Sequence, residues 1–174
     1  YFNRYSYTAN DPVNFWDSTG AAFDRLERFP TIDDAARDLL EHAAQDTRGE
    51  DRRVQRERGG DIKKDQDTGA FYWDSIEVGD NDTIPIRIGD DTVAIAQTHP
   101  RSSGAGRGLE NQRSDRRNNG RISQGDRRQV RQANRHLDEL IPTYVGSYDG
   151  SITRFDPPRY RQGIPVAPPG TLQF

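Results

Sequence analysis

Thr92-Val93-Ala94-Ile95-Ala96 is the most strand-like segment of the chain, and it runs directly into Gln97-Thr98-His99-Pro100. Its five residues are β-branched or small and apolar, which predicts a buried strand between polar neighbours. We therefore expect the rest of the fold to be arranged around this strand, with polar residues held at its end. A functional site is expected where the strand meets the start of a second helix.

Two helices are predicted on either side of this strand along the chain. Thr31 can cap a helix over Thr31–Asp46, whose first turn is acidic. Its apolar positions are Ala35, Ala36, Leu39, Leu40 and Ala43. A second helix is predicted over Ser123–Leu140, because apolar residues recur there on one helical face. Those residues are Val130, Ala133, Leu137 and Leu140. We interpret His42 and His136, one on each helix, as structural residues.

Further strands are predicted between the two helices. Val54–Ile62 is a possible strand interrupted by Gly59-Gly60, a pair that indicates a bulge rather than a phosphate loop. Ala70–Val78 carries aromatic and β-branched residues typical of a strand. Ile84–Ile88 alternates isoleucine with other residues, which predicts a strand, and Pro85 favours an edge position for this strand.

The chain after the second helix predicts a hairpin. Thr143–Ser147 and Ser151–Phe155 flank a turn that contains Asp149-Gly150, a strong hairpin signal. Together, these patterns predict an α+β fold with a mixed β-sheet flanked by the two main helices.

Composition excludes several kinds of site. The chain has 174 residues, a formal net charge of −3 and no cysteine, so disulfides, thiolate zinc sites and cysteine nucleophiles are excluded. The length fits one domain, and no apolar run reaches the roughly 18 residues of a membrane span. The first residues lack both a start methionine and the pattern of a signal peptide. We therefore expect the chain to be a piece of a longer polypeptide.

Basic residues are almost all arginine and are unevenly placed. Lys63 and Lys64 are the only lysines among 25 basic residues, and Arg101–Arg135 carries a net charge of +7. One interpretation is a solvated loop rich in Gly, Ser and Asn. The other is a surface that contacts phosphates of nucleic acid, because arginine binds phosphate bidentately. The candidate nucleic-acid-binding residues are Arg113, Arg116, Arg117 and Arg121.

The amino-terminal segment resembles the closing segment of the Rhs/YD-repeat core. The resemblance lies in Asn3-Arg4-Tyr5-Ser6-Tyr7-Thr8-Ala9-Asn10-Asp11-Pro12-Val13-Asn14, then Asp17 and Gly20, with Ser18 where the family usually has proline. It implies that residues 1–20 end such a core or form the linker after it. It also implies that the following domain is a secreted toxin, caged by the Rhs shell and carried by a secretion system such as type VI secretion. Delivery into the target cell, with the cytoplasm as destination, and a cognate immunity protein are implied as well.

The remainder resembles a family of JAB/JAMM-like toxin domains attached to Rhs proteins. The resemblance lies in the order of short motifs, each of them weak alone. They are Ala35-Ala36, Glu57-Arg58-Gly59-Gly60-Asp61-Ile62, Phe71-Tyr72-Trp73, Gln97-Thr98-His99-Pro100, Ser123-Gln124-Gly125-Asp126 and Ile152 to Asp156-Pro157. The resemblance implies a toxin domain over 21–157 with a JAB/JAMM-like (cytidine-deaminase-like) arrangement. A Pro-rich extended tail over 158–174 is expected to lie over the body or to be left free.

This second resemblance implies a zinc-dependent hydrolase that cleaves an amide or isopeptide bond in a target-cell protein. Carried over motif by motif, it makes His99 and Asp126 ligands of Zn²⁺. Glu57 becomes the general acid/base, and Ser123 the donor to the oxyanion. Gln97, however, stands where the family has the first histidine of a His-x-His-Pro motif. Three accounts stay open: a natural inactive or altered site, an inactivating replacement, or another metal with oxygen ligands.

Each candidate residue also has a structural interpretation. Ser123 and Asp126 match the ordinary start of a helix. His99 matches a satisfied polar histidine, and Glu57 an ion-pair partner of the arginines around it. Two other functions stay open beside the hydrolase: a toxin that cleaves nucleic acid through the basic segment, and a non-catalytic binding domain, which Gln97 favours. The hydrolase requires that Glu57, His99 and Asp126 converge on one cation-sized gap.

Overall fold

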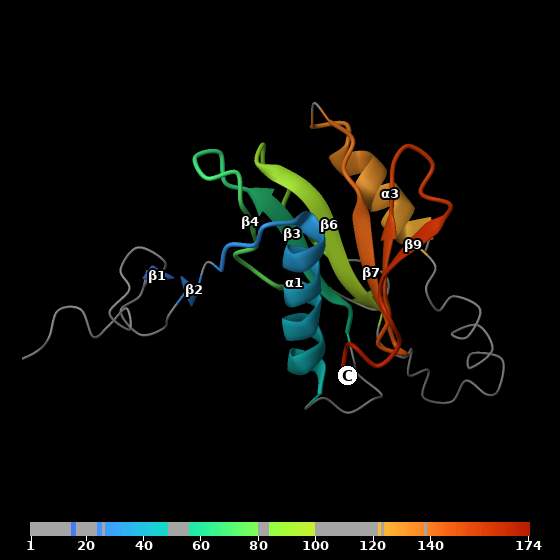
Figure 1. Cartoon of the computed structure of the whole chain (residues 1–174). Coiled ribbons are helices and arrows are strands. Elements are labelled where there is room, and N and C mark those ends of the chain that lie inside the picture. Colours follow the sequence, from blue (N-terminus) through green and yellow to red (C-terminus); the bar gives the residue numbers. More distant parts are fainter. Residues whose placement is uncertain are drawn as a thin grey trace, which may run out of the picture.

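The structure is a computed structural model that describes residues 15–16, 24–25, 27–48, 56–79, 84–99, 122, 124–137 and 139–174. Within these residues, helices α1 (Ile32–Thr47) and α3 (Gln124–Ala133) accompany one seven-stranded mixed sheet (Figure 1). A separate pair is formed by β1 (Phe15–Trp16) and β2 (Asp24–Arg25). The predicted α+β class, with a mixed sheet and two main helices, is confirmed. Neither of these two helices combines the length and the apolar character that crossing a membrane requires.

The sheet is antiparallel except at its centre. Its strands are β3 (Arg58–Lys64), β4 (Phe71–Tyr72), β5 (Glu77–Val78), β6 (Thr92–His99), β7 (Thr143–Ser147), β8 (Ile152–Phe155) and β9 (Gly163–Ala167). They are ordered β4-β3-β6-β7-β8-β9, and β5 pairs with the other half of β3. β6 and β7 run parallel, so the chain between them must cross over, and α3 lies in that connection.

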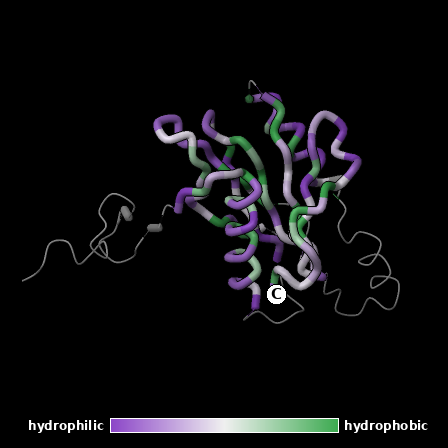
Figure 2. Tube along the Cα trace, viewed as in Figure 1, coloured by the Kyte–Doolittle hydropathy of each residue, from purple (hydrophilic) through white to green (hydrophobic). Residues whose placement is uncertain are grey.

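β6 lies between two apolar cores, one on each face of the sheet. Ala94 and Ala96 belong to the core that α1 covers, whereas Ile95 belongs to the core that α3 covers. β7 alternates in the same way, with Tyr144 on the α1 side and Val145 on the α3 side. Figure 2 shows hydrophobic stretches along these central strands. Each helix therefore buries one face of the sheet.

α1 begins where the sequence predicts it. Thr31 is its N-cap, and the Thr31 Oγ1 accepts a hydrogen bond of 3.1 Å from the backbone N–H of Asp34. The predicted apolar positions are all buried, and the helix packs them on β3 and β6. The predicted range Thr31–Asp46 agrees with the structure to within one residue at each end.

Gly59-Gly60 lies inside β3, where the sequence predicts an interruption or a bulge. Both glycines pair in register with β6, and the bulge falls later, between Ile62 and Lys63. A Cβ atom on Gly59 would stand 2.2 Å from the carbonyl oxygen of Ala96. The prediction is wrong because this glycine serves the close approach of two backbones rather than a bulge.

The predicted strand over Ala70–Val78 is split into β4 and β5. Both pieces pair antiparallel with β3, but their registers differ by one residue, and the chain between them is not in a strand. The carbonyl oxygen of Ser75, in this break, stands 2.5 Å from where a Cβ atom on Gly60 would be. The predicted edge strand over Ile84–Ile88 is wrong, because that segment forms no strand and instead packs against the core on the α3 side.

The second helix is shorter than the predicted Ser123–Leu140. α3 ends at Ala133, and Leu140 is 54% exposed rather than packed on the helix. The side chain of Asn134 accepts a hydrogen bond of 3.0 Å from the backbone N–H of Ile141. This bond folds the chain back toward β7 immediately after the helix, so the apolar periodicity past Ala133 is not helical.

The carboxyl-terminal segment belongs to the sheet more fully than predicted. The hairpin of β7 and β8 around Asp149-Gly150 is confirmed. The tail over 158–174, predicted to be an extended segment over the body or free, contributes the edge strand β9, which pairs with β8. Pro165 lies on this edge strand, where a missing N–H costs no ladder bond. Leu172 is buried in the core that α1 covers.

Candidate metal centre

His99 is the last residue of β6, and the strand directs it to the α3 side of the sheet. Because side chains alternate along a strand, Gln97 and His99 share the face of Ile95, which packs in the core under α3. The His99 side chain is 19% exposed. The end of the most strand-like segment therefore presents two polar side chains to the start of the second helix.

Asp126 reaches the same place from the first turn of α3. It lies four and seven residues before Val130 and Ala133, so all three share the inner face of the helix. Its side chain is only 3% exposed. The apolar spacing that makes α3 amphipathic therefore also turns Asp126 toward the sheet.

Glu57 lies one residue before β3 and completes the group. β3 and β6 pair with Gly59 opposite Gln97, and continuing that register by two residues would set Glu57 opposite His99. Residues that lie directly opposite each other on paired strands point to the same side of the sheet, so Glu57 and His99 are expected on one side. The Glu57 side chain is 13% exposed.

Thr98 fixes the backbone that carries Glu57. Its buried Oγ1 accepts a hydrogen bond of 3.0 Å from the Arg58 N–H and donates one of 3.1 Å to the Arg58 carbonyl oxygen. From the other side, the N–H of Gly79 donates a hydrogen bond of 2.9 Å to the carbonyl oxygen of Glu57. The main chain at Glu57 is therefore held between two neighbouring segments.

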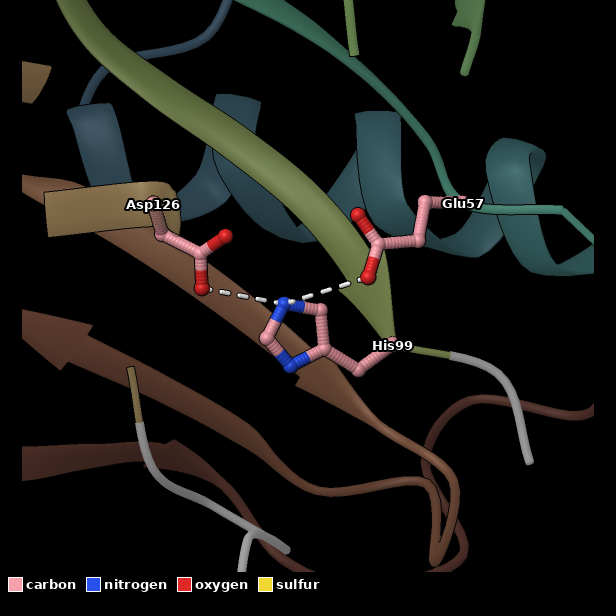
Figure 3. Close-up of side chains that lie close together, drawn as sticks. All are labelled: Glu57, His99 and Asp126. Carbon is pink, nitrogen blue, oxygen red and sulfur yellow. Dashed lines mark ion pairs between the residues drawn. The ribbon is translucent and has the colours of Figure 1, made fainter. Parts of the chain in front are cut away.

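The three side chains converge on one nitrogen atom of His99 (Figure 3). His99 Nε2 lies 3.1 Å from an Oδ2 oxygen of Asp126 and 3.8 Å from an Oε1 oxygen of Glu57. One ligand atom from each residue lies within 4.8 Å of the other two. Ligand atoms about 2.0–2.2 Å from a tetrahedral zinc ion would stand about 3.3–3.6 Å apart. Two of the separations, 3.1 Å and 3.8 Å, lie near this spacing, so the group could hold a metal ion after small side-chain movements.

No family model, curated protein or solved structure matches this chain.

The electrostatics favour a positive charge at His99 Nε2. Burial alone would lower the pKa of His99, but the hydrogen bond that its ring donates to Asp126 and the negative charges of Asp126 and Glu57 outweigh it, so the pKa is raised. The same two carboxylates would stabilise a cation bound beside Nε2. An imidazole and two carboxylates form a donor set that divalent transition metals accept.

Gln97 also reaches this group. It is buried to 1% exposure, and its amide Nε2 lies 3.5 Å from His99 Nε2. Gln97, where the resemblance leads us to expect a histidine, therefore borders the same point in space. This point is surrounded by Gln97 and His99 of β6, by the Asp126 carboxylate of α3 and by the Glu57 carboxylate just before β3.

Ser123 and the four candidate nucleic-acid-binding residues Arg113, Arg116, Arg117 and Arg121 lie outside the residues that the structure describes. His42 instead lies on α1, where it contacts the Asp38 carbonyl oxygen and packs near Trp73.

Thr98 is the one residue of the site that the sequence does not single out. Between Gln97 and His99, it looks like one more β-branched residue of a strand. Its role depends on the Arg58 backbone 40 residues earlier, and no local pattern indicates that pairing.

Proposed function

We propose that the chain carries a metal-dependent hydrolase domain of the JAB/JAMM-like type. The observation that supports it is the convergence of Glu57, His99 and Asp126, whose ligand atoms all lie within 4.8 Å of one another. The bond cleaved would be an amide or isopeptide bond in a target-cell protein. With this function goes the role of a secreted effector toxin, carried by an Rhs shell and neutralised by a cognate immunity protein.

The residues divide into metal ligands and a proton carrier. His99 and Asp126 would hold a zinc ion, and when bound this ion supplies a Lewis acid that lowers the pKa of water toward neutrality. The carboxylate of Glu57 is within reach of the same point, so it can accept a proton there and return it to a leaving amine. Its low exposure keeps the carboxylate in a medium where charges interact strongly. Ser123 keeps its predicted role as donor to the oxyanion.

Gln97 favours a second candidate, a non-catalytic binding domain of the same fold. Its amide borders the candidate metal centre, where the family has an imidazole. An amide oxygen is a poorer zinc ligand than an imidazole nitrogen. The chain with Gln97 is therefore expected to bind zinc weakly, and the Gln97→His variant tightly.

Zinc content and hydrolysis test the proposal together. Purified chain and its Gln97→His variant are loaded with zinc, dialysed, and analysed for bound metal. We expect one zinc ion per Gln97→His chain, little zinc in the parent chain, and none in the variant that combines Gln97→His with Asp126→Ala. The His136→Gln exchange, made in the Gln97→His background, is a matched control because His136 is exposed on a turn after α3.

Substrate screening separates the hydrolase from its alternatives. The zinc-loaded Gln97→His variant is incubated with a proteome, plasmid and RNA. Cleavage of proteins that is lost on Asp126→Ala and on Glu57→Gln is the expected result. Scission of plasmid or RNA that depends on Asp126 would instead identify a nuclease. Zinc binding without any cleavage would favour the non-catalytic domain.

A further inference from the structure

The outward face of α3 is lined by arginine. Arg128, Arg131 and Arg135 follow one another at intervals of three and four residues, so they share one side of the helix and of the turn that continues it. All three are exposed. The opposite side of α3 carries the buried Asp126 and Val130. The helix therefore presents carboxylate and apolar groups inward and guanidinium groups outward.

The loop between β8 and β9 adds two more arginines beside this helix. Tyr160 is buried, accepts a hydrogen bond of 2.6 Å from the Asn134 side chain and donates one of 2.8 Å to the Ile141 carbonyl oxygen. These bonds fasten the loop to the carboxyl-terminal end of α3, and Figure 1 shows the two segments side by side. Arg159 and Arg161, on either side of Tyr160, are both exposed. We call Arg128, Arg131, Arg135, Arg159 and Arg161 the arginine face.

The arginine face makes no ion pair among the residues that the structure describes. Of the described acidic residues between 124 and 141, Asp126 is turned inward, and Glu139 is exposed. The surface thus has a strong local positive charge although the whole chain has a formal charge of −3.

An apolar side chain lies at the edge of the arginine face. Leu140 is 54% exposed. It directly precedes Ile141, whose backbone is bonded to both Asn134 and Tyr160, so Leu140 lies near the junction of α3 and the β8–β9 loop. An exposed leucine close to exposed arginines matches the composition of protein-binding surfaces, where arginine is enriched.

We propose that the arginine face, with Leu140, is a docking surface for an acidic protein partner that offers an apolar contact. Arginine binds carboxylates bidentately, and Leu140 would gain from burial against a protein but not against a phosphate backbone. Sites for single-stranded nucleic acid add aromatic side chains on which bases stack, and the arginine face has none. The surface lies outside the candidate metal centre, and the proposal does not rest on the hydrolase function.

Binding of defined probes tests this docking surface. The probes are a fluorescent peptide rich in glutamate with leucine at regular intervals, and DNA and RNA oligonucleotides of equal charge. We expect the peptide to bind more tightly than either oligonucleotide at the same salt concentration. Arg131→Glu combined with Arg135→Glu should weaken peptide binding about tenfold or more. Arg37→Glu combined with Lys64→Glu, a control of equal charge at exposed positions elsewhere, should leave it unchanged.

A further exchange separates a protein partner from nucleic acid. Leu140→Ser should weaken binding of the peptide and leave binding of the oligonucleotides unchanged. Circular dichroism and urea midpoints equal to those of the parent chain would show that each variant is folded. Tighter binding of an oligonucleotide than of the peptide would overturn the proposal. So would peptide binding that is absent at low salt, or that the arginine exchanges do not change.

Discussion

Replacing Thr98 by valine tests the backbone bond that holds the candidate metal centre together. Valine has nearly the shape of threonine and keeps its β-branch, so the exchange removes the hydroxyl and little else. Thr98 is fully buried, and its Oγ1 makes hydrogen bonds to both the N–H and the carbonyl oxygen of Arg58. Leaving a buried backbone donor unsatisfied costs about 1–3 kcal/mol, and losing the second bond adds about 1 kcal/mol. We therefore expect the free energy of unfolding to fall by about 2–4 kcal/mol.

Urea unfolding followed by circular dichroism measures this loss, with Thr47→Val as the matched control. Thr47 is equally buried, but its Oγ1 only donates to the Ala43 carbonyl oxygen within α1. The control should therefore lose about 0.5–1.5 kcal/mol. Hydrogen exchange should also show a faster Arg58 amide in Thr98→Val alone. A Thr98→Val loss no larger than that of the control, with the Arg58 amide still protected, would refute this account of how Glu57 is positioned.

Three further exchanges test the fold around the site. Gly59→Ala would place a Cβ atom 2.2 Å from the Ala96 carbonyl oxygen, so it should lower the free energy of unfolding by at least about 2 kcal/mol. If urea unfolding shows no loss of stability, the close approach of β3 and β6 is contradicted. Burial raises the pKa of Asp61 above 3.8, so its protonated form stabilises the fold at low pH, and this stability is lost as pH rises through the raised value. Asp61→Asn should therefore gain stability relative to the parent as the pH rises above about 4, where the unfolded carboxyl group ionises, and a constant difference would contradict that sign. Leu172→Ala should lower the free energy of unfolding by about 2–3 kcal/mol, whereas Ile164→Ala, at an exposed position, should lower it by less than about 0.5 kcal/mol. Equal losses of stability would show that the carboxyl-terminal residues are not part of the core.

The elements predicted well are those that local patterns determine. The cap at Thr31, the buried segment that became β6 and the turn at Asp149-Gly150 each depend on residues a few positions apart. The convergence of Glu57, His99 and Asp126 was predicted from motif order, and the strand register and helix face bring them together. The role of each residue in catalysis stays a prediction.

The elements predicted poorly depend on partners far along the chain. The end of α3 is determined by the Asn134 side chain bonding to Ile141 and to Tyr160, 26 residues away. On the other face of the sheet, the Tyr144 hydroxyl donates to Asp33, 111 residues earlier. β9 likewise needs β8 beside it before a Pro-containing segment becomes a strand. Hydrophobic periodicity does not report such distant pairings. The predicted second helix was therefore too long, and the tail was predicted to be unpaired.

Anomalous diffraction at the zinc absorption edge, from crystals of the Gln97→His variant grown with zinc, tests the central claim most directly. The account predicts one strong peak about 2.0–2.2 Å from His99 Nε2 and from a carboxylate oxygen of Asp126, with the Glu57 carboxylate facing it. A zinc-loaded crystal with no peak between these side chains, and with His99 still bonded directly to Asp126, would contradict it.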